Sequence, residues 1–138
     1  MFVEGAPRLL RAGVAIPSLH AGDPERIVVE AYPGVLARRL IGRRSYKQDT
    51  AGKQTPDQRE ARLQMLKLIA EGALADSFGL EVHAEAELAE DPSGDRLDAL
   101  LCAIQAAWAW ERRDEGFGAP PSVDPLEGWI ADPSLAVG

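Results

Sequence analysis

The chain has 138 residues, of which 46% are hydrophobic and 27% charged, as expected of one globular domain. Its net charge of −7 argues against a surface that coats DNA through charge alone. No apolar run approaches the roughly 18 residues of a membrane span, and a single cysteine excludes an internal disulfide framework. We therefore expect a cytoplasmic protein that makes no membrane contact.

Charge is unevenly distributed along the chain. Residues 38–53 hold six basic side chains against one acid, and residues 71–98 hold nine acids against one Lys or Arg. The first segment has the charge to meet phosphate and the second has the charge to meet a metal ion. Two ordinary solvated faces of opposite sign would explain the same pattern.

The clearest strand is predicted at residues 26–34, after an irregular segment at residues 1–23. Ile27, Val28 and Val29 form a continuous β-branched run, which favours a strand covered on both faces, and Pro33-Gly34 ends it. Glu30 then lies near the carboxyl end of the strand, where open α/β sheets place ligand sites. An edge-strand carboxylate that only reaches solvent is the alternative.

Two helices are predicted next, separated by a basic loop at residues 43–53. The first covers residues 34–40 and ends at Gly42. The second begins at Thr55, whose spacing to Gln58 is that of a capping box. Its period turns apolar side chains inward and Arg59 and Arg62 outward. The loop and this helix together offer a surface for phosphate.

The most informative stretch is the helix predicted from Asp95 to about residue 113. Almost every residue in it is Leu, Ile, Ala or Trp, which is typical of a buried helix. At about 100° per residue, one polar stripe collects Asp95, Asp98, Cys102 and Gln105. The acidic stretch before it, residues 79–92, is best explained as a solvated connector.

Asp95 and Asp98 allow two interpretations. Asp-x-x-Asp at a helix start can be an N-cap and N3 pair, favoured by the helix dipole. A polar stripe that continues into an apolar helix favours a carboxylate site instead, because Mg²⁺ is held by a few carboxylates, waters and substrate phosphate. Such ions activate water and stabilise the leaving oxygen of a phosphodiester.

Other kinds of site find no support in the sequence. His20 and His83 are isolated, Cys102 has no second cysteine, and no zinc-ligand spacing exists. P-loop, dinucleotide-binding and nucleophile-elbow motifs are also absent. Carboxylate chemistry remains, with Glu30 at a strand end and two aspartates on a helix.

Five motifs in chain order resemble a known family: IVVEAYPG at 27–34, SYK at 45–47, Arg59 with Arg62-Leu63, DxxDALxCA at 95–103, and EGWI at 127–130. Together they resemble the domain-of-unknown-function 429 family of predicted nucleases with a ribonuclease-H-like fold. The resemblance covers roughly residues 24–133 of what we expect to be a single domain, 1–138. It implies the C-terminal portion of that α/β fold, mostly helical, with one central strand and a short C-terminal strand at 126–131.

The resemblance also implies a metal-dependent nuclease similar to Holliday-junction resolvases. Glu30 matches the strand-end acid, and Asp98 and Asp95 match the helix acids, so these three would be the catalytic ligands of Mg²⁺ or Mn²⁺. Lys47, in the Tyr-Lys motif, would contact the phosphate of a nucleic acid. Arg59 and Arg62 are the further candidates for binding this substrate.

One departure from the family pattern bears on function. The β-meander that carries the family's leading aspartate has no counterpart here, so we expect the strand at Ile27 to lack a partner within the chain. A homodimer, or another partner that supplies the missing strands, would then pair with it. Two functions follow. The first is a metal-dependent phosphodiester hydrolase, or the C-terminal half of one that is inactive alone. The second is a non-catalytic interaction or remnant module, in which the acidic side chains only cap a helix or face solvent.

Overall fold

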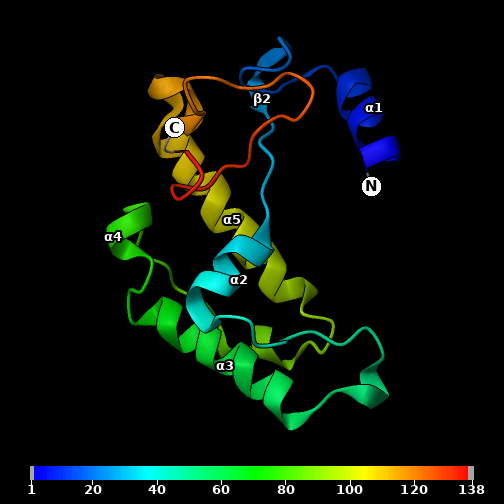
Figure 1. The fold of residues 1–138 in the computed structure, drawn as a ribbon, viewed down its shortest axis with the longest axis vertical. Helices are drawn as coiled ribbons and strands as arrows, with labels where there is room; N and C mark the ends of the chain where they lie inside the picture. The colour runs from blue at the N-terminus through cyan, green and yellow to red at the C-terminus, as the bar shows by residue number, and fades with distance from the viewer. Residues whose placement is uncertain (1, 137–138) are drawn as a thin grey trace. The chain divides into compact units, whose positions relative to one another are not determined.

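The computed structural model describes residues 2–136, which form two compact units (Figure 1). The terminal unit comprises Met1–Ala31 together with Ala109–Gly138, and the central unit comprises Tyr32–Trp108. The predicted α/β class with mainly helical content is confirmed, because two short parallel strands accompany several helices. None of the helices in the described part is long and apolar enough to cross a membrane.

The terminal unit contains α1 (Phe2–Ala12), β1 (Val14–Ala15), β2 (Asp23–Ile27) and, after the end of α5, η3 (Arg113–Gly118). β1 and β2 pair in parallel, with an irregularity between the two residues of β1. Trp129 is buried here, and its indole N–H donates to the carbonyl of Pro17 at 3.0 Å. The C-terminal segment therefore packs on the turn that follows β1.

Three predictions for this unit are wrong. Residues 1–23 are not irregular, because they form α1 and β1. The strand pairs at Asp23–Ile27 rather than over residues 26–34, and β1 supplies the partner that we expected the chain to lack. Residues 126–131 form no strand; Ile130 makes only an isolated parallel bridge with Glu30. The homodimer stays a prediction.

The central unit contains α2 (Pro33–Ile41), η1 (Ala51–Lys53), α3 (Pro56–Ala70), α4 (Ala75–Phe78), η2 (Ala86–Glu90) and most of α5 (Asp95–Glu111). Two predicted helix boundaries here are confirmed, the end of α2 and the start of α3. α2 ends at Gly42, and the capping box forms: the Gln58 amide N–H donates to Thr55 Oγ1 at 3.3 Å, and the Thr55 N–H donates to Gln58 Oε1 at 3.0 Å.

The core of the central unit lies between α2, α3, α4 and α5. Its largest fully buried apolar side chains come from these helices and from the turn after α3: Leu36, Met65, Leu74, Phe78, Leu97 and Leu101. The prediction that α5 is buried all round is wrong. Ala99, Ala103 and Ala106 are exposed, and the polar stripe passes from the exposed Asp95 to the fully buried Gln105. α5 is thus an amphipathic helix whose exposed face is lined by alanine.

Candidate functional site

The candidate site lies at the first turns of α5, where side chains far apart in sequence meet on one carboxylate. The Tyr46 hydroxyl donates to Asp98 Oδ1 at 2.7 Å, and the Lys47 ammonium forms an ion pair with Asp98 Oδ2. Lys47 Nζ also lies 5.3 Å from the centroid of the Tyr46 ring. The side chains of Lys47 and Asp98 are 43% and 18% exposed, so the pair is within reach of solvent.

Two side chains of α3 hold the Tyr46-Lys47 loop in this position. Arg62 is fully buried, and its guanidinium donates to the carbonyls of Tyr46 at 2.8 Å and Ala89 at 2.7 Å, and to Gln54 Oε1 at 2.6 Å. Gln58 Nε2 donates to the Lys47 carbonyl at 2.8 Å. The sequence placed Arg62 on the outer face of the helix, and this is wrong: its donors are all directed to inner acceptors.

The start of α5 is fixed by a turn rather than by the predicted aspartate pair. Asp91 Oδ1 accepts from the Ser93 hydroxyl at 2.8 Å, and Asp91 Oδ2 accepts from the Arg96 N–H at 3.1 Å. These bonds lower the pKa of the Asp91 carboxyl, led by that from Ser93. Asp91, not Asp95 or Asp98, therefore caps the helix, and Asp98 is left to receive Tyr46 and Lys47.

Gly94 brings the helix start and the loop into close approach. Its φ is +74°, and a Cβ there would lie 3.1 Å from Lys47 Cγ. Only glycine meets both demands without strain.

The stripe continues to Gln105, whose side chain binds the segment before α2. The Tyr32 N–H donates to Gln105 Oε1 at 2.8 Å, and Gln105 Nε2 donates to the Tyr32 carbonyl at 3.3 Å. These two bonds hold the YPG motif against the DxxD helix. The sequence pattern had given Gln105 no role. Its place on the polar stripe, two turns after Asp98, was the available signal.

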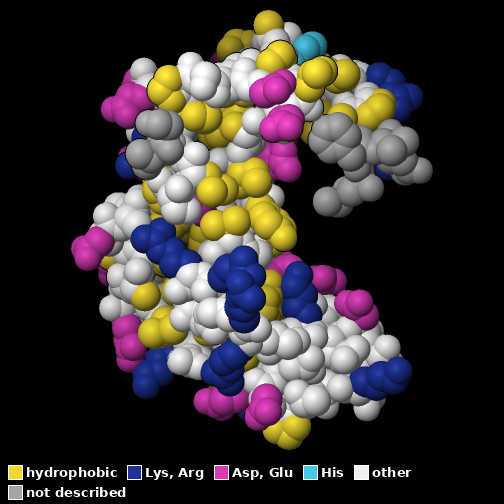
Figure 2. All heavy atoms as spheres, viewed as in Figure 1, with side chains coloured by type: hydrophobic (Ala, Val, Ile, Leu, Met, Phe, Trp, Pro, Cys, Tyr) yellow, Lys and Arg dark blue, Asp and Glu magenta, His cyan; other side chains and the backbone are white. Residues whose placement is uncertain are grey.

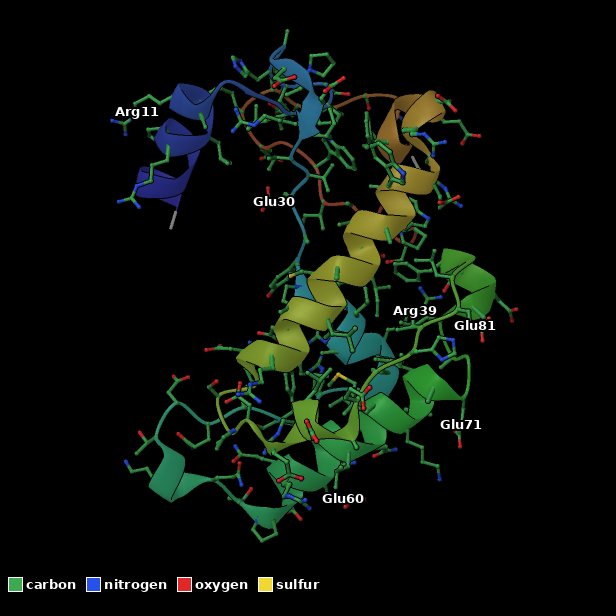
Figure 3. The ribbon with its side chains drawn as sticks, turned by 180° about the vertical axis from the view of Figure 1, so that it is seen from behind. Arg11, Glu30, Arg39, Glu60, Glu71 and Glu81 are labelled. Carbon is green, nitrogen blue, oxygen red and sulfur yellow. The ribbon has the colours of Figure 1, made fainter. Side chains whose placement is uncertain are left out.

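The remaining predicted site residues have other surroundings. Asp95 is exposed on the turn before Asp98. Arg59 forms a two-pronged pair with Glu90, at 2.5 and 3.2 Å. Glu30 belongs to the terminal unit, where its backbone carbonyl accepts from the Ala131 N–H at 2.8 Å and its side chain is exposed (Figure 3).

Burial and the Asp98 charge keep two neighbouring groups protonated. Burial raises the pKa of the Tyr46 hydroxyl, and the hydrogen bond to Asp98 raises it further. Burial likewise raises the pKa of the Cys102 thiol, with the Asp98 charge acting in the same direction. Tyr46 is therefore a hydrogen-bond donor near neutral pH, and Cys102 is not a thiolate nucleophile.

The central unit offers a hard-oxygen donor pair for a divalent cation in Asp95 and Asp98. Asp95 is exposed, and the two oxygens of Asp98 have Tyr46 and Lys47 as partners. Among residues 2–136, no group of three or more His, Cys, Asp and Glu side chains is arranged to hold a metal ion. A cation at these two carboxylates would take its other ligands from water and substrate phosphate.

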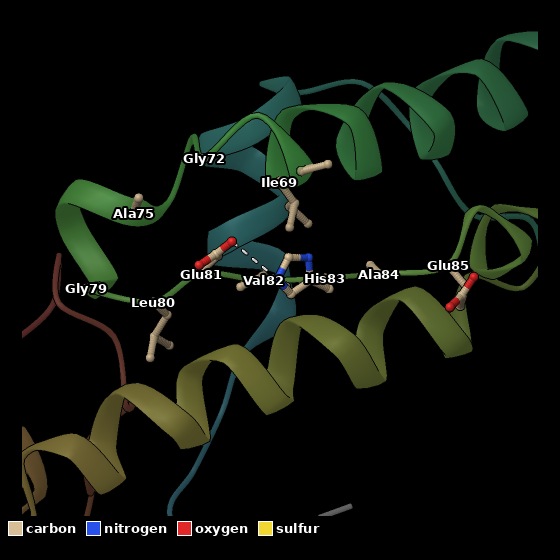
Figure 4. A pocket seen from close by; sticks show the side chains of 11 residues that line it. Ile69, Gly72, Ala75, Gly79, Leu80, Glu81, Val82, His83, Ala84 and Glu85 are labelled. Atoms are coloured by element: carbon tan, nitrogen blue, oxygen red, sulfur yellow. Dashed lines mark ion pairs between the residues drawn. The ribbon is translucent and has the colours of Figure 1, made fainter.

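A groove of about 720 Å³ elsewhere in the central unit lies between the end of α3, α4 and the extended segment 79–85 (Figure 4). His83 Nε2 lies 3.3 Å from Glu81 Oε1, and both side chains are 86% exposed. This groove receives none of the predicted site residues.

Comparison with protein families decides the family of the chain. The family model described as "Protein of unknown function (DUF429)" matches residues 6–123. The chain belongs to the DUF429 family. The match begins before the residue 24 at which we expected the resemblance to start, so it also covers most of α1 and the β1–β2 pair. Searches of curated proteins and of solved structures found no match.

Proposed function

We propose that the chain takes part in metal-dependent hydrolysis of phosphodiester bonds in a nucleic acid, on a scaffold related to the ribonuclease-H-like fold. The observation that carries this proposal is the meeting of Tyr46 and Lys47 on the carboxylate of Asp98. These residues come from the motifs on which the family resemblance rests, and they are 52 and 51 residues away from Asp98 in sequence.

Each side chain has a defined part in the proposed chemistry. Asp98 and Asp95 would hold Mg²⁺ or Mn²⁺, which when bound activates water and stabilises a leaving oxygen. Tyr46 orients Asp98 by donating to one of its oxygens. Lys47, which is half-exposed, exchanges its contact with Asp98 for the phosphate of the substrate. Glu30 is proposed as the third acid, and the reducing cytoplasm as the compartment.

A second candidate function is a non-catalytic interaction module. It is favoured by the fact that both oxygens of Asp98 already have partners within the chain, Tyr46 and Lys47. In that case the carboxylate closes the loop onto α5 and binds no cation. Arg62 has no part in substrate binding under either function, because its donors are spent on buried acceptors.

Titration calorimetry with Mn²⁺ separates the two functions. We expect wild type to release heat and Asp98→Asn to release none, because the amide keeps an acceptor for Tyr46 but loses the charge. Asp76→Asn, an exposed aspartate on α4, is the matched control and keeps the wild-type heat. Equal, negligible heats from wild type and Asp98→Asn would remove the metal site and leave the interaction module.

Cleavage of a labelled oligonucleotide in Mn²⁺ tests the reaction itself. Asp98→Asn should lower the rate by about 100-fold or more, and Glu30→Gln should do the same if Glu30 is the third acid. Thermal unfolding of each variant establishes that it is folded. A wild-type rate equal to that of Asp98→Asn contradicts the proposal.

A further inference from the structure

A basic pocket of about 570 Å³ lies in the central unit beside the candidate site. Arg38, Arg43 and Arg44 line it together with Tyr32 and Tyr46. We infer that this pocket binds one unpaired nucleotide of a single-stranded nucleic acid, its base stacked on Tyr32 and its phosphates on the arginines. The inference rests on the proposed function, since it names the substrate of the same site.

The three arginines carry positive charge that no carboxylate of the described residues neutralises by an ion pair. Within the described part of the chain, Arg44 donates to two neutral acceptors, Gln64 Oε1 and the Asp57 carbonyl. Figure 2 shows Lys and Arg side chains gathered on the face of the central unit where α2 lies. In a chain of net charge −7, a concave site with this charge attracts an anion selectively.

Tyr32 supplies an exposed aromatic face that is held in place. Its side chain is 56% exposed, and its backbone is bound on both sides by Gln105. A Cβ at Gly34 would lie 3.2 Å from Tyr32 Cζ, so the ring lies against the Gly34 backbone. A positioned, solvent-facing ring beside guanidinium groups is how single-stranded nucleic acids are bound without sequence preference.

Tyr46 connects the pocket to the proposed chemistry. Tyr46 lines the pocket, and its hydroxyl donates to Asp98 at 2.7 Å. A residue of the pocket wall thus also contacts the carboxylate of the candidate site. A base within a duplex has both faces covered by its neighbours, so only an unpaired base can stack on Tyr32.

Fluorescence anisotropy in EDTA tests binding independently of cleavage. The probes are fluorescein-labelled single strands of about 12 nucleotides, one of DNA and one of RNA, and the corresponding DNA duplex. We expect both single strands to bind at least about tenfold more tightly than the duplex. Three phosphate contacts predict an affinity loss of about 20-fold between about 50 and 200 mM salt.

Neighbouring arginines on α2 provide a matched pair of variants. Arg38→Gln should weaken binding and lower the salt slope by about 0.7, whereas Arg39→Gln, at an exposed position that does not line the pocket, should change neither. Tyr32→Ala should weaken single-strand binding by about tenfold, and Tyr32→Phe should preserve it. All three positions are exposed, so folding is not at stake.

Equal effects of Arg38→Gln and Arg39→Gln, or equal affinities for single strand and duplex, overturn the inference. Asp98→Asn separates it from the proposed function: we expect this variant to bind the single strand in EDTA and to lose cleavage. If the wild type binds the single strand through the pocket but never cleaves it, the proposed function is wrong and the nucleotide site is retained.

Discussion

Two arginines one turn apart on α3 belong to regions of opposite character. Arg62 is fully buried and donates to three uncharged oxygens from η2, from the Tyr46 loop and from Gln54. Arg59 is 46% exposed and pairs with Glu90, which is itself 54% exposed. Arg62 donates to the carbonyl of Ala89, and Arg59 pairs with the side chain of the following residue, Glu90. The end of η2 is therefore held by one buried contact and one surface contact.

The two arginines carry the same charge, so their different structural roles come from burial and from the acceptors that each one meets. Burial lowers the pKa of Arg62, but its guanidinium keeps three directed donors, which orient carbonyls that would otherwise lie unpaired. Arg59 meets a carboxylate in water, where an ion pair contributes little. The scaffold of the site depends on the first, and we expect the second to be dispensable.

Replacement of Arg62 should produce the largest effect. Arg62→Leu leaves two buried carbonyls and the part-buried Gln54 Oε1 without their donor, and we expect the free energy of unfolding to fall by about 3 kcal/mol or more. Urea denaturation measures this. Arg62→Lys should recover only part of it, because an ammonium cannot reach three acceptors in a fork. A loss as small as that of Arg59→Leu would erase the distinction between the two regions.

Gly94→Ala tests how tightly the loop held by Arg62 is seated on α5. The positive φ and the 3.1 Å approach to Lys47 Cγ predict a loss of about 2 kcal/mol. Gly79→Ala is the matched control, since Gly79 is left-handed with a φ of +66° and has nothing within 4 Å of a Cβ, and we expect about 1 kcal/mol from strain alone. If both variants lose the same free energy of unfolding, the Tyr46-Lys47 loop moves away from the new Cβ at no cost and is not tightly seated on α5.

Asp91→Ala probes the turn between the two regions. Loss of a cap costs about 1 kcal/mol at pH 7. The folded-state pKa of Asp91 is depressed, so its contribution is present above the unfolded-state pKa and is lost as the pH falls through the folded-state pKa. The difference between variant and wild type in urea denaturation should therefore shrink from pH 5 to pH 2; a constant difference would contradict the assignment.

Arg59→Gln should produce the smallest effect. The pair with Glu90 lowers the pKa of that carboxyl and raises the pKa of the arginine, but both groups are solvated. We expect urea denaturation to show little change in the free energy of unfolding, and the change to shrink further in high salt. A loss as large as that of Arg62→Leu would show that Arg59 shares the structural role of Arg62.

The sequence predicted the elements whose signals are local. Thr55 and Gln58 specify the start of α3, Gly42 ends α2, and the apolar period specifies α5. The strand was misplaced because its ladder depends on β1, a two-residue partner with no pattern of its own. Pairing uses Asp23–Ile27 and leaves most of the β-branched run outside it.

The sequence indicated some of the residues that meet at Asp98 but none of their contacts. Asp98 and Lys47 were singled out, yet nothing in spacing indicates that Tyr46 donates to Asp98 across 52 residues. Arg62 was misassigned because helical period places it about 60° from Arg59, on a similarly polar side. Its acceptors are backbone carbonyls of distant segments, which side-chain patterns cannot reveal.

The contact between Gln105 and Tyr32 has one further consequence. A primary amide presents the same donor and acceptor as a peptide group, so one side chain of α5 binds the backbone of Tyr32 as a neighbouring strand would. The segment that enters α2 is thereby kept in register by a helix, without a sheet on that side. Since a single residue sets this register, its chemistry is nearly irreplaceable: Glu offers no donor, Lys no acceptor, and Asn too short a reach.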